Sequence, residues 1–381
     1  MRKNKPFCFV ITYSFLFISQ ILLSQTLDFQ GQFSTSLLYS RNNYSYFHSN
    51  VRYVPQSVLS LERGTSVIDV LLSFNLNSSY GKNFQSENFQ SDINMELYRF
   101  TARLSSDRYE ARIGLQRINF GPGQLLRPLM WFERLDPRDP LQMTKGVYSA
   151  LIKYYFRNDI NIWIWSLFGN KTTKGWEIFK SNERKPEAGG RVEFPLSRGE
   201  FGISVHHRQV KVDESMKRQI PGVKNDFAEN KLGLDLRLDF KFGFWSELCF
   251  INKDLPNTMF LSQKMYMAGI DYTFSIGNGL YTAGEYFYQS LGTKISENLY
   301  PVKLLACTIN YPIDMINSLS VIFFRDSETR DWYRFLQWKI TYDKFRFFIM
   351  GFINSGYLPV GNSAYQAFSG KGIEIMFLYN H

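Results

Sequence analysis

Apolar and polar residues alternate along most of the chain, from Thr26 to Asn380. The clearest segment is 231–240, where one set of alternate positions is apolar (Leu232, Leu234, Leu236, Leu238, Phe240) and the other carries Lys231, Asp235, Arg237 and Asp239. A strand has a side-chain period of two, so this segment offers one face to lipid and one to water. Backbone groups in a bilayer must pair within the protein, which strands achieve only in a closed sheet. The pattern therefore predicts an all-β fold, a transmembrane antiparallel up-and-down β-barrel.

Similar segments recur about eighteen times, with sixteen as the alternative even count. We expect strands at 27–40, 51–62, 66–78, 92–104, 108–119, 147–157, 159–168, 186–195, 200–209, 229–240, 242–252, 265–275, 279–289, 302–312, 318–326, 333–342, 344–353 and 369–379. The connections between them alternate between tight turns and long polar loops. Bacterial barrels have short periplasmic turns and longer external loops, so both termini should be periplasmic. Residues 26–381 are expected to form one barrel domain.

The N-terminus has the pattern of a secretory signal peptide. A basic start containing Arg2, Lys3 and Lys5 precedes an apolar stretch that ends near Leu23, and small or polar residues follow. This order predicts a signal peptide over 1–25, removed after Gln25. A retained membrane helix is the alternative, but strand patterning begins immediately afterwards.

Composition supports an outer-membrane location. Aromatic residues make up 17% of the chain, with 35 Phe and 23 Tyr, and barrels use such residues as girdles at both bilayer interfaces. The formal net charge is +10. An exported barrel has little access to nucleic acid, so we expect no nucleic-acid partner. Outer-membrane lipid, lipopolysaccharide and small hydrophilic or anionic solutes, glycans included, are the partners that fit such a charge. The mature chain keeps two cysteines, Cys249 and Cys307, which we interpret as incidental.

Several charged residues are expected on the luminal faces of the strands. Arg99, Arg103 and Arg112 lie on adjacent predicted strands and could form a basic ladder, while Asp235, Arg237 and Asp239 share one luminal face. Most luminal charges need only solvate a water-filled interior. Catalysis would require a histidine beside a matched nucleophile, and His48, His206, His207 and His381 have none in suitable context. We therefore predict no enzyme, no cofactor and no metal site.

The connection 120–146 is the longest and the least loop-like. It holds large apolar residues, among them Trp131, Phe132 and Leu135, together with four prolines. Such a segment is expected to fold back into the lumen and pack its apolar residues on the wall. Its charged residues would then form a constriction: Arg127, Glu133, Arg134, Asp136, Arg138 and Asp139, with Arg127, Arg134 and Arg138 facing the aqueous path. The alternative is a loop that only plugs or braces the barrel.

A family resemblance rests on the residues around this connection. The segment 114–121, followed by Arg127-Pro128 and by the Asp-Pro pairs within 135–140, resembles a stretch of Gram-negative outer-membrane porins and polysaccharide-export barrels, in a Bacteroidota-like style; Leu115 stands where those families favour Arg. The resemblance implies a porin-like channel for small hydrophilic solutes. It equally allows a polysaccharide-export or capsule-organising barrel, or a structural subunit of an envelope transport machine.

Overall fold

The computed structural model describes residues 25–42, 45–83, 89–219, 225–255, 261–294, 296–355 and 368–381. Apart from Gln25, the expected signal peptide lies outside these residues and stays a prediction. Among the described residues, no helix is both long enough and apolar enough to cross a membrane.

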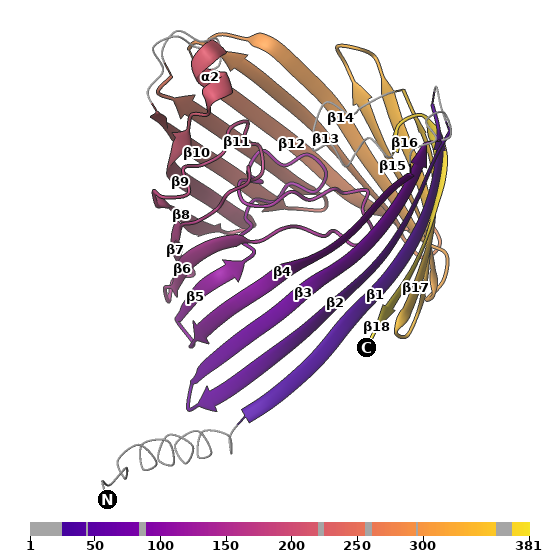
Figure 1. The fold of residues 1–381 in the computed structure, drawn as a ribbon, viewed down its shortest axis with the longest axis horizontal. Helices are drawn as coiled ribbons and strands as arrows, with labels where there is room; N and C mark the ends of the chain where they lie inside the picture. The colour runs from indigo at the N-terminus through magenta and orange to yellow at the C-terminus, as the bar shows by residue number, and fades with distance from the viewer. Residues whose placement is uncertain are drawn as a thin grey trace, which may run out of the picture.

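The described residues form one closed antiparallel sheet of 18 strands, which confirms the expected fold (Figure 1). Each strand pairs with its neighbours in the sequence, and β1 pairs with β18 from Gln32 opposite Asn380 to Arg41 opposite Lys371. The strands are β1 Gln25–Arg41, β2 Ser45–Arg63, β3 Ser66–Asn83, β4 Phe89–Ser105, β5 Tyr109–Gln116, β6 Val147–Tyr155, β7 Asn161–Leu167, β8 Glu187–Leu196, β9 Gly199–Lys211, β10 Asp226–Asp239, β11 Gly243–Lys253, β12 Ser262–Phe274, β13 Leu280–Gly292, β14 Leu299–Pro312, β15 Asn317–Asp326, β16 Trp332–Tyr342, β17 Phe345–Asn354 and β18 Lys371–Asn380.

The first four strands are longer than expected. Residues 41–50 and 80–91 have the polar composition of external loops, yet much of both segments is paired, for example His48 with Gly81. Beyond the bilayer a strand needs no apolar face, so polar sequence can continue the ladder. One short helix, α2 Glu214–Gln219, also lies in a connection for which only loop was expected.

The two faces of the barrel follow the alternation in the sequence. On β10, Leu232 is 41% exposed on the outer face, whereas Lys231 and Asp235 are 4% and 2% exposed inside. The interior is far from an open water-filled tube. Trp245, Met267 and Phe287 project inward from β11, β12 and β13 and are fully buried. An apolar luminal wall requires a cover, and the connection after β5 supplies it.

Candidate functional site: a braced loop across the lumen

The segment between β5 and β6 crosses the barrel interior, where Figure 1 shows loop rather than strand. Two wall carboxylates hold its backbone. Glu247 on β11 accepts the amides of Gly123 and Leu129, both at 2.8 Å. Glu285 on β13 accepts those of Gln124, Leu125 and Leu126 at 2.7, 3.0 and 2.6 Å. Five amides bonded to two carboxyl groups fix the path of the loop, because breaking these bonds would leave donors of the loop without acceptors.

Close approach to Glu247 also explains two glycines. Gly121 has φ of +89°, and a Cβ there would collide with the Glu247 carboxylate. A Cβ at Gly123 would meet the same carboxylate oxygen and the side chain of Met267. Only glycine lets the backbone come this close to the wall.

Apolar packing completes the attachment of the loop. Trp131 and Phe132 are 1% and 3% exposed and join one cluster with Phe120 and Trp165. The Phe120 ring stacks on Trp165 at 5.6 Å and meets Trp131 edge-on at 5.3 Å. The indole N–H of Trp131 donates to the sulfur of Cys249 on β11. Leu135, also expected on the wall, is half-buried and borders a cavity instead.

The charged residues of the loop pair mainly with one another. Glu133 accepts from Arg117 and, at 2.7 Å, from Arg127. Arg138 makes a two-bond pair with Asp136, at 2.8 and 3.0 Å, and lies over the ring of Phe335. Arg127 and Arg138 border a cavity, yet they are only 8% and 3% exposed. Both side chains are therefore much more buried than we expected for residues that face the aqueous path.

A second connection, 168–186 between β7 and β8, folds inward against the first. The indole of Trp176 donates to the carbonyl of Arg127 at 2.7 Å. Arg134 donates to the carbonyl of Gly175 at 3.2 Å and to the hydroxyl of Thr173 at 2.6 Å. Sequence reasoning missed this contact, although Trp176 in a polar connection was an available signal.

Buried ion pairs attach this second loop to β8, β9 and β10. Lys174 reaches Glu187 at 2.8 Å, and Glu177 meets Lys231 at 3.1 Å and Arg208 at 3.3 Å. Burial alone would raise the pKa of Glu177, but Lys231, Arg208 and Lys174 hold that pKa below its usual range. Glu177 is therefore ionised in the assembled lumen.

His206 belongs to this wall. Its Nδ1 accepts the indole N–H of Trp165 at 3.2 Å, so its Nε2 carries the proton donated to Glu187 at 3.0 Å. Both ring nitrogens are thus used in packing. Within the described residues, no group of three or more His, Cys, Asp or Glu side chains could hold a metal ion.

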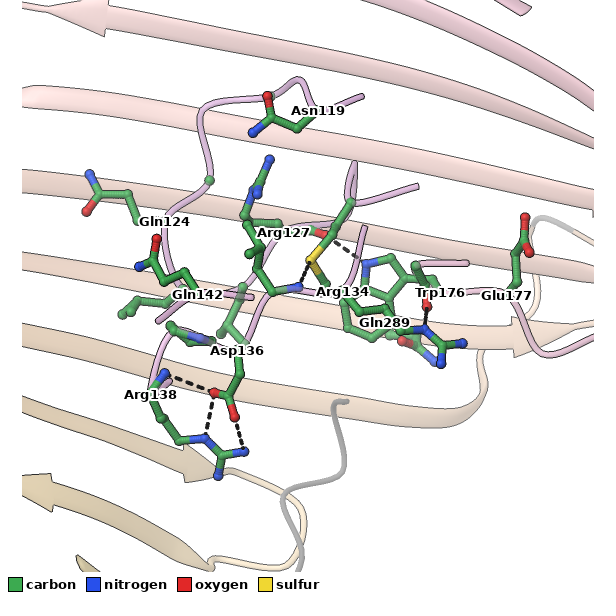
Figure 2. A pocket seen from close by; sticks show the side chains of 18 of the residues that line it. Asn119, Gln124, Arg127, Arg134, Asp136, Arg138, Gln142, Trp176, Glu177 and Gln289 are labelled. Atoms are coloured by element: carbon green, nitrogen blue, oxygen red, sulfur yellow. Dashed lines mark hydrogen bonds and ion pairs between the residues drawn. The ribbon is translucent and has the colours of Figure 1, made fainter. Parts of the chain in front are cut away.

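Two cavities flank the crossing loop. One of about 470 Å³ lies between the loop and the β12–β15 side, bordered by Arg117, Trp176, Gln263 and Gln289 (Figure 2). The other, of about 310 Å³, lies toward β1, β2 and β18, bordered by Ser36, His48, Arg52 and Glu374. Arg134 and Asp136 border both. These two side chains therefore stand where the loop divides the lumen.

Asp139 lies beside the smaller cavity. Its carboxylate accepts the amides of Leu141 and Met143 at 2.9 and 3.3 Å. Burial raises the pKa of Asp139 despite these bonds. Asp139 is therefore easier to protonate than an exposed aspartate.

The remaining luminal candidates do not gather at the loop. Arg103 and Arg112 share Glu110, at 3.1 and 2.8 Å, and Arg103 also lies 3.9 Å from Asp69, so two carboxylates offset the expected basic ladder. Arg99 instead braces the end of the loop by donating to the carbonyl of Thr144 at 2.8 Å. Asp235 is buried under Arg191, and Arg237 pairs with Asp239 at 3.2 Å.

No model of a known protein family matches the chain, and no curated protein does. Solved structures do match. OmpT, an outer-membrane protein of Vibrio cholerae, is 10% identical with a TM-score of 0.51, over 94% of this chain and 100% of that one. The fold is that of outer-membrane porins.

Two further structures with the porin fold match this chain over a similar share of its length. The anion-selective porin of Comamonas acidovorans is 12% identical with a TM-score of 0.51, over 94% of this chain and 100% of its own. OccK2 of Pseudomonas aeruginosa, solved with glucuronate, is 9% identical with a TM-score of 0.55, over 93% of this chain and 97% of its own. At such identities the likeness concerns the porin fold alone.

Proposed function

We propose that the chain forms a passive channel in the outer membrane that admits small hydrophilic solutes, with the loop 120–146 as its constriction. The observation that carries this proposal is the braced crossing of the lumen. The loop is held by the Glu247 and Glu285 carboxylates, and cavities remain on both sides of it. A solute moving through the barrel has to pass Arg134 and Asp136. Outer-membrane lipid, lipopolysaccharide included, would surround the apolar outer faces of the strands.

The charge beside the larger cavity favours small anions. Arg117 and Arg127 share the single carboxylate of Glu133, and Arg117, whose side chain is 42% exposed, presents positive charge to the cavity. Asp136, which also borders this cavity, is paired with Arg138. Rings of charged side chains set the selectivity of pores. We infer a preference for small carboxylated solutes, acidic sugars included, a cargo class represented by the glucuronate in the OccK2 structure.

Single-channel recording in a salt gradient tests both parts of the proposal. The purified barrel should conduct ions without any partner protein, and its reversal potential should have the sign expected for an anion-selective channel. Arg134→Gln and Arg117→Gln should each move that potential toward cations. Arg103→Gln is the matched control, because Arg103 is luminal but pairs with Glu110 and borders neither cavity. A protein that inserts without conducting would refute the channel.

The other roles allowed by the sequence predict different results. A polysaccharide-export or capsule-organising barrel should bind glycan, and its deletion should alter the surface coat without loss of solute uptake. A structural subunit of an envelope machine should co-purify with partners and conduct little.

A further inference from the structure

Four basic side chains project from the outer wall at the external ends of neighbouring strands. They are Arg325 on β15, Arg334 on β16, Lys371 on β18 and Arg41 on β1, here called the basic band, and all four are exposed. The residues on either side of Arg334, Tyr333 and Phe335, are buried on the luminal side, so Arg334 faces outward. The long connections mark this end of the barrel as external.

The strand register brings the basic band together. Lys371 lies directly opposite Arg41, and Ile353 of β17 lies between Lys371 and Arg334. Strands are about 4.8 Å apart, so the charges of Lys371 and Arg41 are near neighbours. Like charges directly opposite each other destabilise a sheet. A bound anion would offset this repulsion.

The carboxylates of the residues that the structure describes do not supply that anion. None of the four cations forms an ion pair with a described residue. Two acidic groups of the adjoining hairpin are engaged elsewhere: Glu328 pairs with Lys303 at 2.7 Å, and Asp326 accepts the amides of Glu328 and Thr329. An anionic partner would have to come from outside this part of the chain.

A tryptophan organises two of the cations. The guanidinium groups of Arg325 and Arg334 lie 5.3 and 5.5 Å from the ring centre of Trp332. A shared aromatic platform holds both guanidiniums in place, which lowers the entropy cost of closing them on an anion. Tryptophan is also typical of the level at which a barrel meets lipid headgroups.

Apolar residues lie directly below the basic band on the outer wall. Leu336, Trp338, Ile373 and Ile375 are all more than 40% exposed, at 49%, 42%, 45% and 50%. Acyl chains can cover such a surface, and the cations stand at its upper edge. A molecule with apolar chains and an anionic head fits both regions at once, and arginine favours phosphate through paired hydrogen bonds.

We propose that the outer wall over β15, β16, β18 and β1 binds the phosphorylated headgroup of an outer-leaflet lipid. Arg325 and Arg334, held by Trp332, grip one phosphate, and Lys371 with Arg41 attract phosphate at the neighbouring strands. The inference rests on the outer-membrane residence proposed above but not on conduction. A barrel that binds the lipid and passes no ions would leave it standing.

Native mass spectrometry of the full barrel in neutral detergent tests the site, with lipid A carrying two phosphates as the probe. We expect discrete lipid adducts, with binding about tenfold weaker for the double variant Arg325→Gln/Arg334→Gln, as the loss of charge-assisted hydrogen bonds implies. Dephosphorylated lipid A should bind about as weakly. The matched control is Lys211→Gln, which removes an outward cation that lies beside Asp226 and far from the band; it should keep nearly full binding.

Heat-modifiable migration on gels shows whether each variant has folded, and Arg325→Lys/Arg334→Lys should retain part of the affinity. Equal binding by the Gln variant and the native chain, or by lipid A with and without phosphates, would overturn the proposal. So would displacement of lipid A by millimolar inorganic phosphate, which would identify a free-anion site. Loss of self-association in the Gln variant, without any change in lipid binding, would instead assign the band to a second copy of the chain.

Discussion

The Glu247 and Glu285 side chains are the residues on which the path of the constriction depends most. Replacing both with Gln leaves one acceptor oxygen where each carboxyl group has two, and these groups bind five loop amides. An amide left without an acceptor costs about 1–3 kcal/mol, so the loop should lose its fixed position. We expect single-channel conductance to rise and become noisier. Glu110→Gln is the control, because Glu110 pairs with Arg103 and Arg112 away from the loop; an unchanged trace in the double variant would contradict this anchoring.

Protonation of Asp139 should make the ion selectivity of the channel depend on pH. Its pKa is raised by burial, so it gains a proton at a higher pH than an exposed aspartate. Since the folded pKa lies above the unfolded one, this group favours folding more as the pH falls through the folded value. Protonation also removes a negative charge beside the smaller cavity. The reversal potential should therefore move toward anions on mild acidification, and Asp139→Asn should reduce that shift.

Leu236 and Arg237 test the two faces of β10 with adjacent residues. Leu236 belongs to the lipid face, where a cation costs from about 0–1 kcal/mol near the interfaces of the bilayer to about 2–4 kcal/mol at its midplane. Leu236→Arg should lower the yield of heat-modifiable barrel. Arg237→Leu should be much milder, because Arg237 only pairs with Asp239 at the exposed luminal end. Similar losses from the two changes would mean that the assignment of the two faces is wrong.

At the scale of elements, the loop and its wall form one packed unit. Trp131→Ala should cost about 3–5 kcal/mol, the usual range for removing a buried aromatic ring, and should lower the temperature at which the barrel unfolds on gels. Trp338→Ala removes an indole that is 42% exposed on the outer face, so it controls for loss of a tryptophan from the barrel. Equal shifts from the two variants would show that the loop adds nothing to stability.

The sequence predicted the elements better than their contacts. Strands and faces follow from the period of two, and the inward course of 120–146 follows from its apolar content. The wall that receives the loop was not identified. One signal was present: on β11 the inward positions Trp245, Cys249 and Ile251 are apolar, as most of the outward ones are, so part of the inner face had to be covered. Pairings such as Arg127 with Glu133 depend on the bends of the loop, which side-chain periodicity does not describe.

At the scale of the whole molecule, the even strand number and the β1–β18 pairing leave no open edge in the described sheet. A closed sheet with an apolar outside is stable in a bilayer and not in water. The native host should therefore yield the protein in the outer-membrane fraction, as a band that migrates differently before and after boiling. Recovery in the soluble periplasm would contradict the membrane assignment.

The carboxylate anchors hold the loop by its peptide groups, and peptide groups are common to almost every amino acid. Gln124 and Leu125 could thus be exchanged without loss of these bonds, whereas Gly121 and Gly123 could not, because any side chain there strikes Glu247. The groups that fix the path of the constriction are therefore different from the side chains that contact the solute. Such a chain is a suitable starting point for evolving or engineering new cargo preferences: the side chains that meet the solute can vary while the frame that presents them stays constant.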